Sequence, residues 1–328
     1  MDTLTGDYQH RLNWLDSTKV IGIILVYIGH CNIPDVNPYI YLFHMPLFFI
    51  ISGFCWNTDK NANMPFRNFA EKKFNRYIIP YFKICTVCFI VFTVIMGYNR
   101  YGVSHEWGRD MAIKLFAILI YSRGTTDWLP NCSPVWFLTC LFYAEILFYY
   151  IMKRNRPYLY VILAGFIGYA MSQVGKFFPW NIDNAFSAIP LIYIGVIIKK
   201  YWSRLSNMKY LLFLLPISAA IVMFGIKGVD FDGNRYKNML AMYLQSIIIS
   251  YTLLLLCSVV FKTGWKFLPQ FGRNTIILFG YNYAINTLLL SFVPFVASTW
   301  IMAFLVVVMG GMIVVIANKF PILKRVLV

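Results

Sequence analysis

The sequence predicts an all-α fold, a polytopic integral membrane bundle of about ten transmembrane helices. Hydrophobic residues make up 59% of the 328 residues, and the mean hydropathy is +0.63. Soluble domains contain roughly 45 to 50% apolar residues, so this excess indicates a lipid environment. Apolar runs of about 15 to 24 residues recur between short polar stretches, without the period-two alternation of barrel strands. We therefore expect residues 1–328 to form one transmembrane domain.

The apolar runs place the membrane spans along the chain. We expect helices near residues 14–33, 38–56, 77–98, 134–152, 158–175, 185–199, 209–226, 238–261, 275–291 and 299–317. The polar residues 1–13 lack a basic region leading to a small-residue cleavage site, so the first run is predicted to be a retained helix and not a signal peptide. The segment 111–121, "MAIKLFAILIY", is too short to span and predicts an interfacial or re-entrant helix on the outer side.

The positions of the basic residues predict the topology. With the N-terminus inside, the inner segments hold 21 of the 29 Lys and Arg residues, and the outer segments hold 8. The inner set consists of Arg11, Lys19, Lys60, Arg67, Lys72, Lys73, Arg76, Lys83, Lys153, Arg154, Arg156, Lys199, Lys200, Arg204, Lys209, Lys262, Lys266, Arg273, Lys319, Lys324 and Arg325. The positive-inside rule therefore predicts that both termini are cytoplasmic. The net charge of +16 reflects this topology and contact with anionic membrane lipids, and it does not indicate nucleic-acid binding.

Seven cysteines are scattered mainly through the apolar runs. Cys85 and Cys88 form a C-x-x-C pair, but the apolar sequence around them does not favour a redox or metal role. Cys31 and Cys132 are both predicted on the outer side and could pair. We expect no metal site.

The first predicted span carries three ionisable residues on one face. At about 100° per residue, Asp16, Lys19 and His30 fall within an arc of roughly 60°. At about 1.5 Å per residue, Lys19 lies roughly 16 Å from His30 along the axis. Ionisable residues within a bilayer usually face a bundle interior or a water-filled cavity, so each is a functional candidate.

His44 lies in the second predicted span, within "YLFHMPLFFIISGF". The turn between the first two spans is centred near residues 36 and 37, so His30 and His44 lie equally far from it. Antiparallel helices would bring both imidazoles to a similar depth, and we predict that they meet in one site. Pro46 is expected to bend the second span and to free a backbone carbonyl near Leu42. The alternative is that each histidine only hydrogen-bonds a neighbouring helix.

These motifs resemble the acyltransferase 3 family, integral membrane enzymes that acylate mainly bacterial surface carbohydrates, and especially its fucose 4-O-acetylase-like branch. The opening "RLNWLDSTKVIGIILVYIGH" contains the family's basic residue and histidine with ten residues between them, here Lys19 and His30. "KKFNRYIIPYF" resembles its basic run on the inner side. "VWFLTCLFYAEI" and "IPLIYIGVIIKKY" resemble two of its later helices. One departure is Asn282, which stands where the family often has a histidine.

The resemblance implies an O-acyltransferase of the bacterial cytoplasmic membrane. Its acyl donor would be cytoplasmic acetyl-CoA or another acyl-CoA, and its acceptor a hydroxyl of a cell-surface or lipid-linked carbohydrate. Besides this carbohydrate the expected partners are membrane lipids, with no nucleic acid, and the oligomeric state is left open, a homodimer included. The alternative function is a polysaccharide or lipid-linked sugar transporter or flippase without acyl transfer.

Acyl transfer needs a held thioester, a base for the hydroxyl proton and the exclusion of water. An imidazole with an ordinary pKa near 6.5 is mostly neutral at pH 7, so His30 is the predicted base and His44 its orienting partner. A covalent acyl-histidine is a kinetic alternative. The predicted donor-binding residues are Asp16, Lys19, Lys72, Lys73, Arg76 and Arg273. The predicted substrate-binding residues are Trp136, Glu145 and Asn282, although Glu145 and Trp136 lie on opposite faces of one predicted helix.

Overall fold

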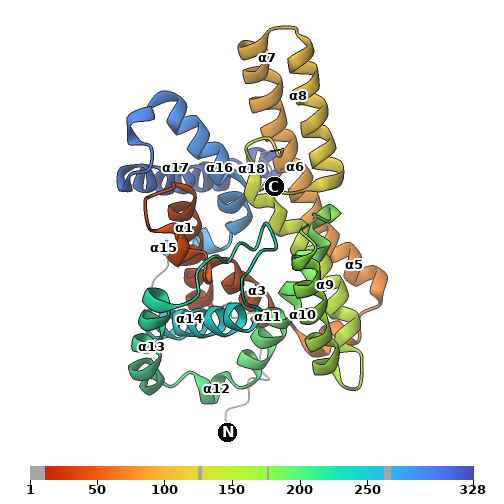
Figure 1. Cartoon of the computed structure of the whole chain (residues 1–328), viewed down its shortest axis with the longest axis vertical. Helices are drawn as coiled ribbons and strands as arrows, with labels where there is room; N and C mark the ends of the chain where they lie inside the picture. The colour runs from red at the N-terminus through yellow and green to blue at the C-terminus, as the bar shows by residue number, and fades with distance from the viewer. Residues whose placement is uncertain (1–11, 125–127, 176, 262–266) are drawn as a thin grey trace.

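Almost every segment of the chain is helical in the computed structural model, which describes residues 12–124, 128–175, 177–261 and 267–328 (Figure 1). The α-helices are α1 (Asn13–His30), α2 (Asn37–Ile40), α3 (His44–Phe54), α4 (Thr58–Ala62), α5 (Phe66–Lys73), α6 (Ile79–Cys88), α7 (Met96–Tyr101), α8 (His105–Phe116), α9 (Trp136–Met152), α10 (Pro157–Gln173), α11 (Ile182–Lys200), α12 (Trp202–Leu205), α13 (Leu211–Phe224), α14 (Met239–Val260), α15 (Phe267–Gly272), α16 (Thr275–Phe292), α17 (Trp300–Lys319) and α18 (Pro321–Leu327). Short π-helical or 3₁₀ segments are η1 (Phe74–Ile78), η2 (Phe89–Ile95), η3 (Ala117–Tyr121), η4 (Ser133–Val135), η5 (Pro179–Asn181), η6 (Met208–Tyr210) and η7 (Pro294–Val296).

The described residues contain six helical segments that are long and apolar enough to cross a membrane. They are Phe66–Tyr101, Ser133–Met152, Pro179–Lys200, Met239–Val260, Thr275–Phe292 and Trp300–Lys319. Met208–Phe224 is apolar but shorter. The ten predicted spans all fall on helices, although α1 is more polar, and α3 and α10 have only 11 and 17 residues. The predicted helical membrane bundle is confirmed.

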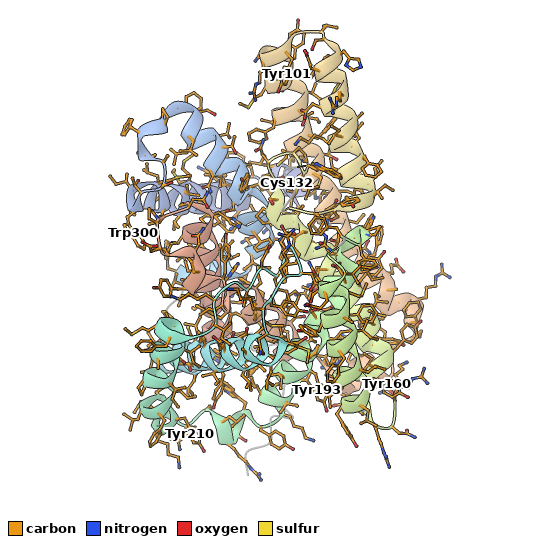
Figure 2. The ribbon with its side chains drawn as sticks, viewed as in Figure 1. Tyr101, Cys132, Tyr160, Tyr193, Tyr210 and Trp300 are labelled. Atoms are coloured by element: carbon orange, nitrogen blue, oxygen red, sulfur yellow. The ribbon has the colours of Figure 1, made fainter. Side chains whose placement is uncertain are left out.

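Large apolar side chains cover the outside of this bundle. Leu212 on α13 is 76% exposed and Phe304 on α17 is 67% exposed. The side-chain view places Trp300 and Tyr101 at the periphery as well (Figure 2). Such a surface is unstable in water but is the expected surface of a protein embedded in lipid.

The second predicted span is divided into two helices. After α2, the chain leaves helical geometry at Phe43 (φ −146°), and α3 begins at His44. Pro46 is the third residue of α3, where its missing N–H needs no partner within the helix. The second span is therefore interrupted at Phe43, three residues before the proline, and is not bent at Pro46 itself, which lies in a first helical turn. The carbonyl of Leu42 is free of a helical partner, as predicted, and it accepts a hydrogen bond from Ser246 Oγ at 2.9 Å.

The segment 111–121 belongs to a longer helix than predicted. Together α8 and η3 run from His105 to Tyr121, and α8 packs against η2 and α7. Figure 1 shows α7 and α8 side by side at the top of the view. The segment is thus part of the second arm of a helical hairpin, and not a separate short helix.

Helix α1 lies inside the bundle, in contact with α3, α14, α16 and α17. Helix α3 also packs against α11. Gly53 on α3 and Gly195 on α11 each lie so close to the backbone of the opposite helix that a Cβ atom would collide. This packing places Lys19, in the second turn of α1, and His30, its last residue, against neighbouring helices. Four residues counted in the topology argument, Arg11, Lys176, Lys262 and Lys266, lie outside the described residues.

Candidate functional site

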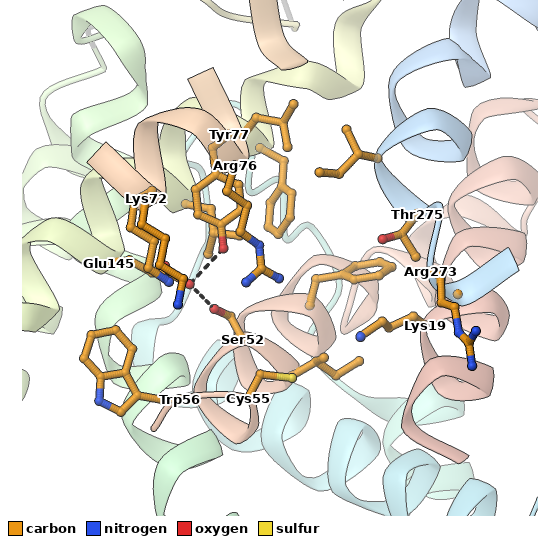
Figure 3. A pocket seen from close by; sticks show the side chains of 18 of the residues that line it. Lys19, Ser52, Cys55, Trp56, Lys72, Arg76, Tyr77, Glu145, Arg273 and Thr275 are labelled. Atoms are coloured by element: carbon orange, nitrogen blue, oxygen red, sulfur yellow. Dashed lines mark hydrogen bonds and ion pairs between the residues drawn. The ribbon is translucent and has the colours of Figure 1, made fainter. Parts of the chain in front are cut away.

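A cavity of about 370 Å³ lies beside the first half of α1, and we call it the basic cavity. Its basic lining residues are Lys19, Lys60, Lys72, Lys73, Arg76, Arg273 and Lys324. Five of the six predicted donor-binding residues are thus brought together from distant parts of the chain. The sixth, Asp16, pairs with Lys19 at 2.8 Å between Oδ1 and Nζ. In Figure 3, Arg76 and Lys19 point toward the middle of the cavity from opposite sides. Such a concentration of positive charge favours a ligand that carries several negative charges.

Glu145, a predicted substrate-binding residue, is held by the protein in the wall of the basic cavity. Its carboxylate forms an ion pair with Lys73 and accepts hydrogen bonds from Ser52 Oγ at 2.5 Å and from Tyr77 Oη at 3.0 Å (Figure 3). Glu145 is 2% exposed. These contacts fasten α3, α5, η1 and α9 together, and they engage Lys73 as well.

A second cavity, of about 300 Å³, lies at the other end of α1, and we call it the histidine cavity. Both His30 and His44 line it, so the prediction that the two residues meet in one site agrees with their positions. Its lining also includes Trp136, two tyrosines, Tyr41 and Tyr283, and two aspartates, Asp230 and Asp232. Trp136 and Glu145 therefore serve different cavities, as their opposite faces on one helix predicted.

The side chain of Asn282 contacts His30 and is not among the residues that line the histidine cavity. Asn282 Oδ1 lies 2.5 Å from His30 Nδ1. An amide oxygen only accepts hydrogen bonds, so Nδ1 carries the proton and Nε2 has the free lone pair. The predicted contact of Asn282 with a sugar therefore becomes, in this geometry, a contact that selects the tautomer of His30.

His44 has the same arrangement with a backbone partner. Its Nδ1 lies 3.0 Å from the carbonyl oxygen of Ile40, which can only accept, and its ring lies 5.0 Å from the ring of Tyr41. Nε2 is again the atom that can take a proton. The α2–α3 break produces this contact, because it places the carbonyl of Ile40 at the end of one helix and His44 at the start of the next.

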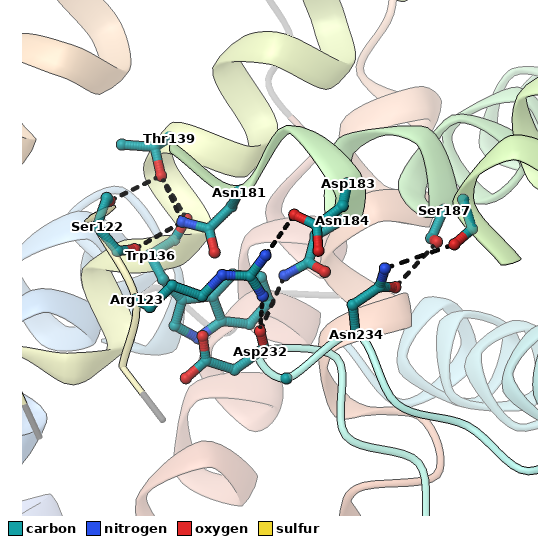
Figure 4. A network of polar contacts seen from close by, with 12 residues as sticks. Ser122, Arg123, Trp136, Thr139, Asn181, Asp183, Asn184, Ser187, Asp232 and Asn234 are labelled. Carbon is teal, nitrogen blue, oxygen red and sulfur yellow. Dashed lines mark hydrogen bonds and ion pairs between the residues drawn. The ribbon is translucent and has the colours of Figure 1, made fainter. Parts of the chain in front are cut away.

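A buried polar network that sequence reasoning missed holds the chain over the histidine cavity. Arg123 is fully buried and donates to the carboxylate of Asp183 and to the backbone oxygen of Asp232 (Figure 4). Asn184 Nδ2 donates to the same backbone oxygen at 3.1 Å. The network thus fastens residues 225–238, between α13 and α14, to the start of α11. The sequence indicates only that Arg123 is one of the eight basic residues of the outer segments, and nothing local links it to an aspartate 60 residues away.

Three phenylalanine rings lie between the two cavities. Phe48 and Phe137 line the basic cavity, and Phe279 lines the histidine cavity. The ring centroids lie 6.0 Å apart for Phe48 and Phe137, 6.2 Å for Phe48 and Phe279, and 5.3 Å for Phe137 and Phe279. We call these three residues the phenyl layer. The rings come from α3, α9 and α16, so the layer joins the helices around α1.

The cysteine geometry differs from the pairing considered from sequence. Cys132 Sγ lies 3.8 Å from Cys85 Sγ, and all seven cysteines are free thiols. Cys132 is therefore the neighbour of Cys85 in the structure, and no bond joins it to Cys31.

Comparisons with known proteins identify the family. Residues 12–317 match the family model described as an acyltransferase domain, Acyl_transf_3. Neither the curated proteins nor the solved structures yielded a match. The matched region includes α1 to α16, all but the last two residues of α17, and all the lining residues of the histidine cavity. The long apolar helices and this match together show that the chain is an integral membrane protein that belongs to the acyltransferase 3 family.

Proposed function

We propose that this membrane acyltransferase moves an acyl group, in the first instance acetyl, from cytoplasmic acyl-CoA to a hydroxyl group of a carbohydrate. The observation that carries the proposal is the position of the two cavities along α1, with a cation-lined cavity near Lys19 and an imidazole-lined cavity at His30. A charged donor and a neutral hydroxyl acceptor need these two different environments. The bacterial cytoplasmic membrane and the fucose 4-O-acetylase-like branch belong to the same proposal.

The basic cavity is suited to the phosphates of CoA. Lys19, Lys72, Arg76 and Arg273 line it from three separate segments of the chain, so they can surround an anion of extended shape. Charge-assisted hydrogen bonds to phosphate are stronger than neutral ones, and guanidinium groups can form two at once. The acyl-pantetheine arm would then follow α1 toward His30, over the roughly 16 Å that eleven helical residues span.

In the histidine cavity, His30 would act as the general base. Nε2 takes the proton of the acceptor hydroxyl while the hydroxyl oxygen attacks the thioester carbonyl carbon. The carbon–sulfur bond then breaks, and the CoA thiolate receives the proton from the imidazolium. In the covalent alternative, Nε2 attacks the carbonyl carbon itself and the carbon–sulfur bond breaks to release the CoA thiolate. The acceptor hydroxyl then displaces the imidazole from the acyl group, and its proton goes to the thiolate. Both routes use the same nitrogen atom, and Asn282 supports both because it keeps the proton on Nδ1.

The acceptor would bind among the aromatic and acidic side chains of the histidine cavity. Trp136 offers an apolar ring face, while Asp230 and Asp232 offer carboxylate oxygens that accept hydrogen bonds from sugar hydroxyls. A carbohydrate presents both apolar C–H faces and hydroxyl groups. This combination favours a sugar over a purely apolar acceptor such as a fatty alcohol.

The direct test uses the purified chain in lipid nanodiscs with acetyl-CoA. We expect CoA release to rise when a surface polysaccharide or lipid-linked sugar is added, and mass spectrometry to find the acetyl ester on that sugar. A transporter would instead move the sugar across a vesicle membrane without consuming acetyl-CoA. Acyl-CoA that stays intact with every carbohydrate tried, in protein that binds CoA, would refute the proposal. Mass spectrometry of surface glycans with and without the gene would identify the acceptor.

A further inference from the structure

The boundary between the two cavities is about one helical turn thick. On α9, Trp136 lines the histidine cavity and the next residue, Phe137, lines the basic cavity. On α3, Met45 lines the histidine cavity and Phe48 lines the basic cavity. Three residues of helix rise only about 4.5 Å, so the side chains of the phenyl layer make up most of the boundary.

The phenyl layer is closed and apolar in this structure. Phe48, Phe137 and Phe279 are 8%, 7% and 4% exposed, and their ring pairs are tilted or edge to face. The layer continues to the outer loop, because Phe49 contacts both Phe137, at 5.0 Å, and Phe231, at 5.5 Å, between ring centroids. Phenyl rings offer water no hydrogen-bonding side-chain atom, so water in one cavity has no polar path through them.

We propose that Phe48, Phe137 and Phe279 form a gate that the acyl-pantetheine arm must part in order to bring its thioester to His30. This inference rests on the proposed function and adds to it the residues that control access to the reaction. Charged groups of CoA stay in the basic cavity, because a cation-lined cavity holds phosphates and an apolar layer does not. The narrow, mostly apolar arm is the part of the donor that suits such a passage.

The gate would also protect the thioester from hydrolysis. Acyl transfer competes with water for the same carbonyl carbon, and a closed apolar layer denies water a route to it until the arm fills the gap. The three rings come from three helices, α3, α9 and α16, so the gate would open by rotation of these side chains. Helix α1, which carries both Lys19 and His30, can therefore stay fixed during the reaction.

The test compares alanine and tryptophan at gate positions. In Phe137→Ala, we expect CoA release without acceptor to rise on the order of tenfold relative to transfer, because water reaches the thioester. In Phe279→Trp, we expect transfer to fall on the order of tenfold while CoA binding is unchanged, because Phe279 does not line the basic cavity and its larger replacement obstructs the arm but not the nucleotide. Phe279→Ala, on a different helix, should repeat the effect of Phe137→Ala.

Phe142→Ala is the matched control, because Phe142 is on the same helix and lines neither cavity. CoA binding in each variant reports that the protein is folded. If the parent transfers acetyl groups and the ratio of hydrolysis to transfer in all gate variants equals that of Phe142→Ala, the gate is refuted and the proposed function survives. If the parent neither transfers nor hydrolyses acyl-CoA, the proposed function itself fails. If the alanine variants do not fold, loss of transfer with retained CoA binding in Phe279→Trp still supports the gate, and normal transfer there overturns it.

Discussion

His30 and Asn282 meet through a 2.5 Å contact between Nδ1 and Oδ1, although 252 residues separate them in the chain. The contact joins the last residue of α1 to α16 inside the bundle. It assigns the proton of a neutral His30 to Nδ1 and the lone pair to Nε2. The proposed role of His30 depends on its Nε2, and Asn282 supports that role by accepting the hydrogen bond from Nδ1.

Replacing His30 tests the base. We expect His30→Ala to reduce acyl transfer by at least about 10² to 10⁴-fold, the usual contribution of general acid–base catalysis, and by more if Nε2 also carries the acyl group. CoA binding should persist, because the basic cavity is separate. His44→Ala should cost less, since a water molecule can replace an orienting group. The measurement is transfer in nanodiscs with CoA binding as the folding control. Activity of His30→Ala within about tenfold of the parent would assign the base elsewhere, with His44 as the next candidate.

Asn282 tests the tautomer. In Asn282→Ala we expect kcat to fall on the order of tenfold with an unchanged affinity for CoA, because His30 loses the partner that keeps its proton on Nδ1. Asn282→Asp should retain more activity than Asn282→Ala, since a carboxylate oxygen also accepts from Nδ1. Steady-state kinetics on the three proteins decide the matter. Equal kcat in Asn282→Ala and the parent would show that His30 does not need this contact.

The affinity for CoA should depend on the basic side chains of the basic cavity that do not pair with Glu145, such as Lys72. We expect Lys72→Ala and Arg76→Ala, combined, to weaken CoA binding in calorimetry by roughly 1.5 to 3 kcal/mol per lost charge-assisted contact. If Lys73→Ala is added and the fold survives, CoA binding should stay weakened, because all three residues are predicted donor-binding residues. Unchanged CoA affinity in the double variant would mean that these cations serve only topology.

Lys73→Ala alone provides the contrast, because Lys73 already pairs with Glu145. Removing one partner of a buried pair typically costs about 3 to 5 kcal/mol, so this variant should lower the thermal unfolding temperature more than Lys72→Ala does. Lys73→Met combined with Glu145→Gln should recover part of that loss.

Arg123 should stabilise the wall of the histidine cavity. We expect Arg123→Ala to destabilise the protein by about 3 to 5 kcal/mol, because Asp183 would be left buried and unpaired. The KM for the acceptor should rise as well, since residues 225–238 lose an anchor, while CoA affinity should not change. Thermal unfolding and kinetics with each substrate varied separate these effects. Normal stability together with a normal acceptor KM would contradict the role of the network.

The topology prediction is tested by reporters. A reporter fused after Val328 or inserted within 58–72 should behave as cytoplasmic, and one within 227–237 as external, because the basic residues divide 21 to 8 between the two sides. Labelling of the 58–72 loop from outside intact cells would overturn this assignment.

Helical periodicity made part of the site predictable. Asp16, Lys19 and His30 share one face because the helix repeats every 3.6 residues, and the structure places Lys19 and His30 at two cavities along that face. The same arithmetic separated Trp136 from Glu145. The position of the break in the second span, at Phe43, and the true length of the helix that contains 111–121 could not be predicted, since they depend on how the chain pairs with neighbours outside the local window.

The sequence by itself determined that the chain is a helical membrane protein, because a helix that crosses lipid needs a long apolar run. It also indicated His30 and His44 as candidates for one site, because local spacing decides which residues share a helix face. Only the tertiary structure decided which side chains meet across helices. Asn282 beside His30, Glu145 between Lys73 and Ser52, and Arg123 beside Asp183 are each contacts between distant residues. The phenyl layer likewise exists only where α3, α9 and α16 meet. Such contacts depend on the packing of whole helices, and no local pattern of residue types records that packing.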